Sequence, residues 1–125
     1  MQEESFKQLA EAEAHFLRGW NYATLYNWYG SLPLYRSTSD NPLQPRATEE
    51  ETRSFIEQEL TLAVSALPNQ APVFGRASRG TALAVLCKYY LNTKQWQEAA
   101  EAAQDIIDLG QYSLLPSYSD VFAFE

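Results

Sequence analysis

The sequence predicts an all-α fold of stacked antiparallel helix pairs: four main helices and a C-terminal tail folded back on them. Apolar residues recur at helical spacing in segments at about residues 5–29, 48–67, 79–92 and 95–109. The break between the last two segments, residues 92–95, is short enough to make those helices antiparallel. Apolar residues make up 46% of the 125-residue chain, which is enough for a packed core in one domain.

The first helix, about residues 5–29, has an apolar face in its first half and becomes apolar nearly all round after Ala23. A helix that is apolar on all sides is buried by several neighbours. We therefore expect the large aromatic residues of the helical stripes to be core residues, namely Trp20, Tyr26, Trp28 and Trp96. Gly30 suits the position after the helix, where φ is usually positive, and Pro33 prevents continuation.

Residues 31–47 form a long loop with three prolines, and long ordered loops are often functional. Tyr35 in this loop is the one candidate ligand-binding residue, because an exposed aromatic ring offers a flat face on which a sugar ring can stack. A plain surface loop is the alternative. The second helix, residues 48–67, opens with a capping box of Thr48 and Glu51.

The third and fourth helices, residues 79–92 and 95–109, share one apolar seam. Small residues on the fourth helix let the third helix approach closely, so that Trp96 caps the seam; they are Ala99, Ala100 and Ala103. The tail after Gly110 has too much apolar area to remain in water, and we expect it to fold back on the helices with a short helical turn near residues 117–122. Its apolar residues are Tyr112, Leu114, Leu115, Tyr118, Val121, Phe122 and Phe124.

Composition and residue pattern argue against several functional classes. A net charge of −7 argues against nucleic acid and anionic membrane surfaces as partners, because both need clustered basic residues. Cys87, the only cysteine, lies on an apolar seam, and no cysteine cluster or second histidine joins His15 in a metal site. The carboxylates lie on polar helix faces, and the sequence has no nucleophile motif or phosphate loop. We therefore predict no catalytic residue, metal site or cofactor: the chain is not an enzyme.

Residues 78–110 resemble one tetratricopeptide repeat, a helix pair that stacks on its neighbours. Lys94 stands where the turn usually has glycine, and Gly110 stands where the repeat usually ends with proline. The first two helices are a candidate for a second, diverged unit. Stacking is expected because one repeat cannot bury its own face. The matching positions are Leu86, Cys87 and Tyr90 in the first helix and Trp96, Ala99 and Ile106 in the second.

Five short segments, in order and at the right spacing, resemble the SusD/RagB family of outer-membrane nutrient-binding lipoproteins. They lie within residues 11–20, 30–34, 45–68, 75–91 and 110–122. The first, EAEAHFLRGW, is similar to the family's EA-x-FLRA helix, and the second, GSLPL, is similar to its GG-x-PL turn. The departures are modest: Gly19 replaces alanine, and Cys87-Lys88 stands where the family often has Ala-Arg.

The resemblance implies a non-catalytic surface lipoprotein of the outer membrane that captures glycans or other nutrients and delivers them to a TonB-dependent transporter. Family members are several times longer, with a signal peptide and a lipidated cysteine, so residues 1–125 are expected to be one helical domain of a longer protein. The family's sugar-binding residues lie largely outside the helical repeats, so the resemblance assigns none here. We expect bare apolar surface, through which the fragment self-associates.

Two other functions remain open from the residues alone. The first is a free-standing tetratricopeptide-type module whose concave face binds a peptide, which predicts a polar groove and a fold that needs no further sequence. The second is an α-helical enzyme, which predicts a pocket where titratable side chains with strongly shifted pKa values converge.

Overall fold

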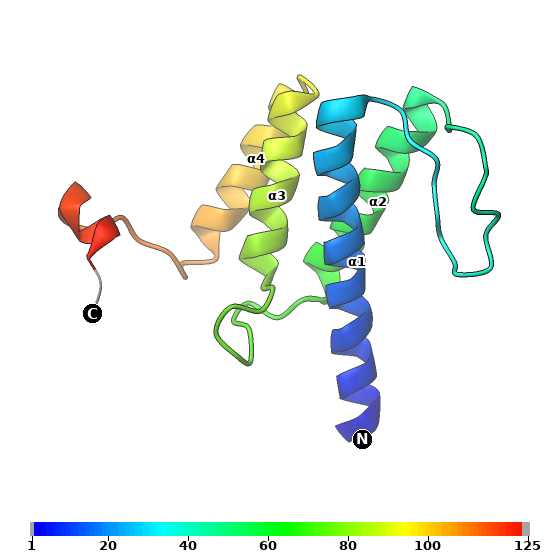
Figure 1. Ribbon diagram of the computed structural model, residues 1–125. Helices are drawn as coiled ribbons and strands as arrows, with labels where there is room; N and C mark the ends of the chain where they lie inside the picture. The colour runs from blue at the N-terminus through cyan, green and yellow to red at the C-terminus, as the bar shows by residue number, and fades with distance from the viewer. Residues whose placement is uncertain (1, 124–125) are drawn as a thin grey trace.

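The computed structural model describes residues 2–123 and consists of four α-helices and a short 3₁₀ helix, η1 (Figure 1). No strand occurs in these residues, so the all-α prediction is confirmed. Helix α1 packs against α2, and α3 packs against both α2 and α4. The bounds are Gln2–Tyr29 for α1, Glu49–Ala66 for α2, Arg79–Asn92 for α3, Trp96–Asp108 for α4 and Tyr118–Phe122 for η1.

Local sequence explains where these helices begin and end. The predicted capping box is present at α2, where the Thr48 hydroxyl accepts from the Glu51 N–H at 3.1 Å and the Glu51 carboxylate accepts from the Thr48 N–H at 2.8 Å. Gly30 ends α1 with φ +69°, as expected. Lys94 takes the turn between α3 and α4 with φ +61°, the conformation that explains the usual glycine at this repeat position.

The core lies where α1, α2 and α3 meet. Gly19 brings α1 close to α2, because a Cβ at this position would lie 2.9 Å from the Leu60 side chain. Helix α4 adds nothing to this cluster; its buried residues are Ala99 and Ala102. The core residues are Ala12 and Phe16 from α1, Ile56, Leu60, Ala63 and Leu67 from α2 and its end, and Ala82, Leu86 and Tyr89 from α3.

The expectation that the tryptophans are core residues is wrong. The exposed fractions of Trp20, Trp28 and Trp96 are 49%, 77% and 62%, and only Tyr26 of the predicted set is half-buried. Trp96 therefore does not cap the seam. The reason is the number of neighbouring helices. Helix α4 packs on α3 alone, and α1 has only a short contact with α3. Both α1 and α4 therefore keep an apolar side that no other helix covers.

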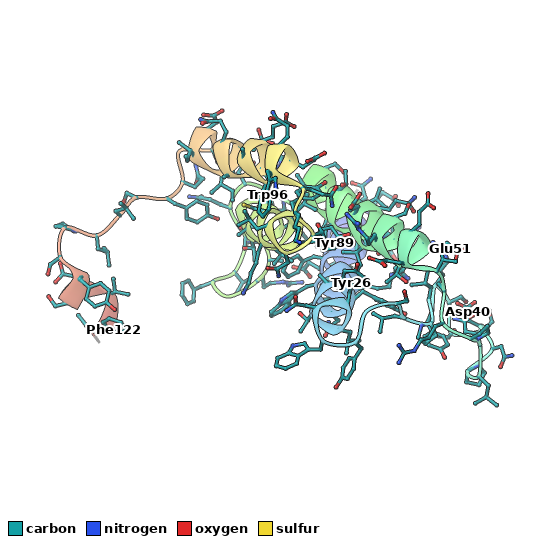
Figure 2. All side chains as sticks on the ribbon, turned by 90° about the horizontal axis from the view of Figure 1, so that it is seen from above. Tyr26, Asp40, Glu51, Tyr89, Trp96 and Phe122 are labelled. Carbon is teal, nitrogen blue, oxygen red and sulfur yellow. The ribbon has the colours of Figure 1, made fainter. Side chains whose placement is uncertain are left out.

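The tail does not fold back on the helices, contrary to expectation. It projects from the end of α4, at the opposite end of the molecule from the loop that holds Asp40 (Figures 1 and 2). The short helical turn is present as η1, but Tyr118 and Phe122 pack on each other, with ring centroids 5.3 Å apart. Apolar area shows that a surface needs a partner, but not which surface provides it. Phe124 lies outside the described residues.

Tyr112 ties the beginning of the tail to α3. Its hydroxyl lies 3.3 Å from the Ser78 hydroxyl, and its ring rests on Gly80, where a Cβ would come within 2.3 Å of that oxygen. Beyond this contact, Leu114 is fully exposed. None of the helices in residues 2–123 combines the length and the apolar character that crossing a lipid bilayer requires.

Leu60→Ala should destabilise the fold by about 2–5 kcal/mol, because Leu60 is completely buried between α1 and α2 and its truncation leaves a cavity. Leu62→Ala, on the exposed side of the same helix, should change stability by no more than about 0.5 kcal/mol. Urea unfolding followed by circular dichroism measures both. Equal losses would contradict this assignment of the core.

Gly80→Ala should release the tail without unfolding the helices, because the new methyl group occupies the place of the Tyr112 ring. Limited proteolysis should then cleave residues 111–117 faster than in the parent chain, while the helical circular dichroism signal is unchanged. Lys88→Ala, at an exposed position of α3 away from its capped N-terminus, is the matched control for helix stability. An unchanged cleavage rate in Gly80→Ala would show that Tyr112 does not hold the tail.

Candidate ligand-binding surface

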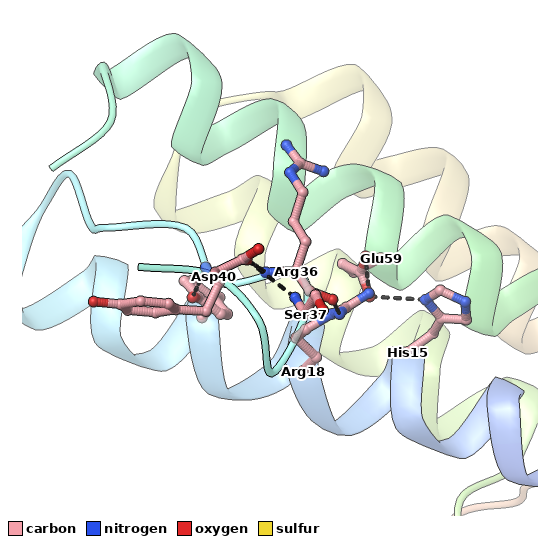
Figure 3. A network of polar contacts seen from close by, with 8 residues as sticks. His15, Arg18, Arg36, Ser37, Asp40 and Glu59 are labelled. Carbon is pink, nitrogen blue, oxygen red and sulfur yellow. Dashed lines mark hydrogen bonds and ion pairs between the residues drawn. The ribbon is translucent and has the colours of Figure 1, made fainter. Parts of the chain in front are cut away.

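A buried carboxylate joins α1 to α2 close to the long loop. Glu59 is 5% exposed and accepts two hydrogen bonds from the Arg18 guanidinium, at 2.7 and 2.9 Å (Figure 3). His15 Nδ1 lies 2.8 Å from the same carboxylate. Burial by itself raises the pKa of Glu59, but the hydrogen bonds from Arg18 and His15 outweigh it and lower that pKa below its ordinary value. His15 thus has a structural partner that the sequence did not indicate.

Arg18 also connects this cluster to the loop, because its guanidinium donates to the Arg36 carbonyl at 3.0 Å. The Arg36 guanidinium in turn lies 4.6 Å from the centre of the buried Phe55 ring, on the face of α2 that the loop covers. Asp40 closes the turn by accepting from the Arg36 and Ser37 N–H groups, and these bonds lower its pKa. The loop is therefore ordered by α1 and α2.

Tyr35, the predicted ligand-binding residue, is half-buried within this loop. Its hydroxyl donates to the Pro42 carbonyl at 2.8 Å, and its backbone N–H donates to the Tyr22 hydroxyl at the same distance. The bond to Pro42 connects the two arms of the loop, and the bond to Tyr22 fastens the loop to α1. The hydroxyl of Tyr35 is thus engaged in a hydrogen bond within the exposed loop, and the part of the ring that reaches solvent is what remains for a ligand.

A second surface, not predicted from the sequence, is a groove of about 310 Å³ between the C-terminal halves of α1 and α3. The Trp20 and Trp28 rings line it together with the side chains of Asn27, Lys88 and Asn92. The amides of Asn27 and Asn92 have no hydrogen-bond partner among residues 2–123. We call this feature the indole groove. Flat apolar faces beside unpaired amides suit a polyhydroxylated ligand such as a sugar.

Below the indole groove the aromatic side chains are structural. Tyr89 lies at its floor with its ring centre 6.4 Å from that of Tyr26, and its hydroxyl donates to Glu57 at 3.1 Å. Burial and the nearby Glu57 carboxylate raise the pKa of Tyr89, so its hydroxyl stays protonated as a donor. Within residues 2–123, no group of three or more His, Cys, Asp or Glu side chains is placed to hold a metal ion.

These features define a class of protein: a scaffold of stacked helix pairs with an ordered loop and an aromatic groove. The particular family follows from comparison with known proteins. Residues 1–91 match the SusD-like family described as starch-binding and associating with the outer membrane. Because this match covers more than half of the chain, the chain belongs to the SusD-like family of carbohydrate-binding proteins.

Individual relatives agree with this assignment. The chain is 29% identical to a SusD-like protein of Bacteroides ovatus over 98% of its length, but it spans only 25% of that relative. A SusD-like carbohydrate-binding protein of Bacteroides fragilis has a similar structure, with a TM-score of 0.84, 27% identity, and 94% of this chain and 24% of the neighbour covered. A further neighbour, solved with a xylogluco-oligosaccharide, has a TM-score of 0.82 and 28% identity over 95% of this chain and 27% of its own.

Glu59→Gln should destabilise the fold by about 1.5–3 kcal/mol at neutral pH, because the change removes the charge that Arg18 faces. Since the folded-state pKa of Glu59 is lowered, its contribution is complete above the ordinary value of 4.5 and is lost as the pH falls through the folded-state pKa. The parent chain should thus lose more stability between pH 6 and pH 3 than Glu59→Gln does. Urea unfolding at each pH measures this.

The matched control for this pH series is Glu50→Gln, because Glu50 is exposed on the same helix. It should differ from the parent chain by no more than about 1 kcal/mol at any pH, which is the size of the interaction between a first-turn carboxylate and the helix dipole. If Glu59→Gln loses as much stability on acidification as the parent chain, the Glu59 carboxylate is not a source of the acid sensitivity.

Proposed function

We propose that this chain is the helical part of a longer, non-catalytic glycan-binding protein of an outer-membrane polysaccharide uptake system. The protein would lie on the cell surface as a lipoprotein. There, the helical part would position the ligand-binding loops and present a surface to a TonB-dependent transporter. The observation that carries the proposal is the family match over residues 1–91. The neighbour solved with a xylogluco-oligosaccharide supports glycan as the ligand class.

Because the chain spans about a quarter of its curated relative, binding has to be tested on the longer protein. Calorimetric titration with xylogluco-oligosaccharides and malto-oligosaccharides should give saturable binding without release of shorter products. Pull-down of a TonB-dependent transporter from detergent-solubilised outer membranes tests the partner. Product release on incubation with these sugars would contradict a non-catalytic role, and binding to none of a panel of glycans would contradict the ligand class.

We also propose that the chain self-associates when it is alone, through apolar side chains that have no partner. Val73, Phe74 and Leu114 are more than half exposed, and Trp28 is 77% exposed. This apolar surface favours a part of a larger protein over a free-standing peptide-binding module, which needs no further sequence to cover it. Light scattering over a concentration series measures the association.

Tyr35→Ala in the longer protein should weaken glycan binding about three- to tenfold, the effect of losing one aromatic stacking contact. Tyr35→Phe should bind like the parent, because it keeps the ring and removes only the hydroxyl that bonds to Pro42. Calorimetric titration measures both. Trp28→Ala is the comparison at the indole groove: a loss there with Tyr35→Ala unchanged would move the contact from the loop to the groove.

A further inference from the structure

The indole groove is one part of a longer trough between α1 and α3, which lie side by side in Figure 1. A second hollow, of about 590 Å³, continues the groove toward the beginning of α3, and Trp20, Val85 and Lys88 line both parts. Helical spacing explains the shape, because each helix lines the trough with residues at positions i, i+3 and i+7. These residues are Trp20, Ala23 and Asn27 on α1, and Val85, Lys88 and Asn92 on α3. We call the whole feature the α1–α3 trough.

The charge of the α1–α3 trough is opposite to that of the chain as a whole. Among residues 2–123, its lining contains two basic side chains, Arg76 and Lys88, and no carboxylate. Another surface pocket, beside α2, does contain carboxylates, including those of Glu49 and Glu57. In a chain with a net charge of −7, the trough is therefore a surface where neighbouring carboxylates do not repel an anionic ligand.

Lys88 is the basic group of the trough that is free to bind a ligand. The Arg76 guanidinium already donates to the Glu13 carboxylate at 2.7 Å. The Lys88 ammonium, in contrast, makes no ion pair within residues 2–123. A ligand carboxylate at Lys88 would accept a charge-assisted hydrogen bond, which is roughly twice as strong as a neutral one.

The other groups of the trough suit the body of a sugar chain. Trp20 and Trp28 are 49% and 77% exposed, so their flat indole faces are open to stacking on sugar rings. The eight positions that separate them on α1 correspond to roughly 12 Å of helix, so a ligand that touches both is longer than one sugar ring. The unpaired amides of Asn27 and Asn92 each donate and accept hydrogen bonds, as sugar hydroxyl groups do.

We propose that the α1–α3 trough binds an oligosaccharide of uronic acids, with its rings on the two indoles and a carboxylate on Lys88. This inference rests on the proposed function for glycan as the ligand class, and it adds the charge of the glycan and a second site. The site is separate from Tyr35, which is bonded to Tyr22, and the Tyr22 ring packs on Phe55 at the α2 side of α1. An acidic peptide also suits Lys88, but the match to a starch-binding family favours a sugar.

Calorimetric titration of the longer protein with short oligosaccharides of galacturonic, mannuronic and glucuronic acid tests the proposal. The matched neutral ligand is the methyl ester of the same oligosaccharide, which keeps the sugar rings and removes the charge. At least one of the acids should bind, and its methyl ester should bind about tenfold more weakly. Added salt should weaken the binding of the acid and leave that of the ester unchanged.

Variants of the same protein locate the site. Lys88→Gln should weaken binding of the acid about tenfold, and Lys88→Arg should keep most of the affinity because it keeps the charge. Lys94→Gln is the matched control and should bind like the parent, because it removes the same charge from an exposed turn outside the trough. Trp28→Ala should weaken binding of the acid about three- to tenfold, whereas Tyr35→Ala should leave it unchanged. Circular dichroism checks that each variant folds.

Binding of none of these acids would overturn the proposal, and so would binding that Lys88→Gln and Trp28→Ala both leave unchanged. An oligoglutamate peptide that displaces the bound sugar at a similar concentration would also overturn it, because the trough would then recognise charge alone.

The same titrations distinguish this proposal from the proposed function. Binding of xylogluco-oligosaccharides or malto-oligosaccharides without binding of any acid would reject the trough alone. Release of shorter products from a bound acid, with the dependence on Lys88 intact, would support the trough and reject the non-catalytic role.

Discussion

The need to pair one buried carboxylate organises the first half of the molecule. Glu59 lies between α1 and α2, and an uncompensated charge at such a position costs several kcal/mol. Arg18 and His15 compensate it, which fixes the rotation of α1 against α2. Because the Arg18 guanidinium also bonds to the Arg36 carbonyl, the same interaction holds the loop. Gly19, beside Arg18, allows the close approach that these distances require.

In the second half of the molecule the helices are held together by apolar contacts, and part of their apolar surface stays uncovered. Helix α3 packs on the α1–α2 pair through Leu86 and Tyr89, whereas α4 packs on α3 through Ala99 and Ala102. Helix α3 therefore contacts all three other helices, whereas α4 contacts α3 alone, and apolar side chains of α4 and of the tail stay exposed. An ordered loop at one end and bare apolar surface at the other suit a scaffold that works as part of a larger protein.

Several features were predictable because they depend on residues close together in the sequence. The four helices, the capping box at Thr48 and the positive φ of Gly30 follow from periodicity and local steric rules. The family signature was readable for the same reason, since it consists of short segments in order. The predicted core positions of Trp20, Trp28 and Trp96 were wrong, because periodicity identifies an apolar stripe without showing whether another helix reaches it.

The sequence by itself determined the helices, their ends and the family, all of which are properties of neighbouring residues. Only the tertiary structure decided which apolar stripes are covered, where the tail lies, and that His15, Arg18 and Glu59 form one cluster. The last two are separated by 41 positions, and nothing in the spacing of a charged residue on one helix indicates its partner on another. Burial and charge pairing depend on how the helices pack, and this packing depends on all the helices that the chain brings together.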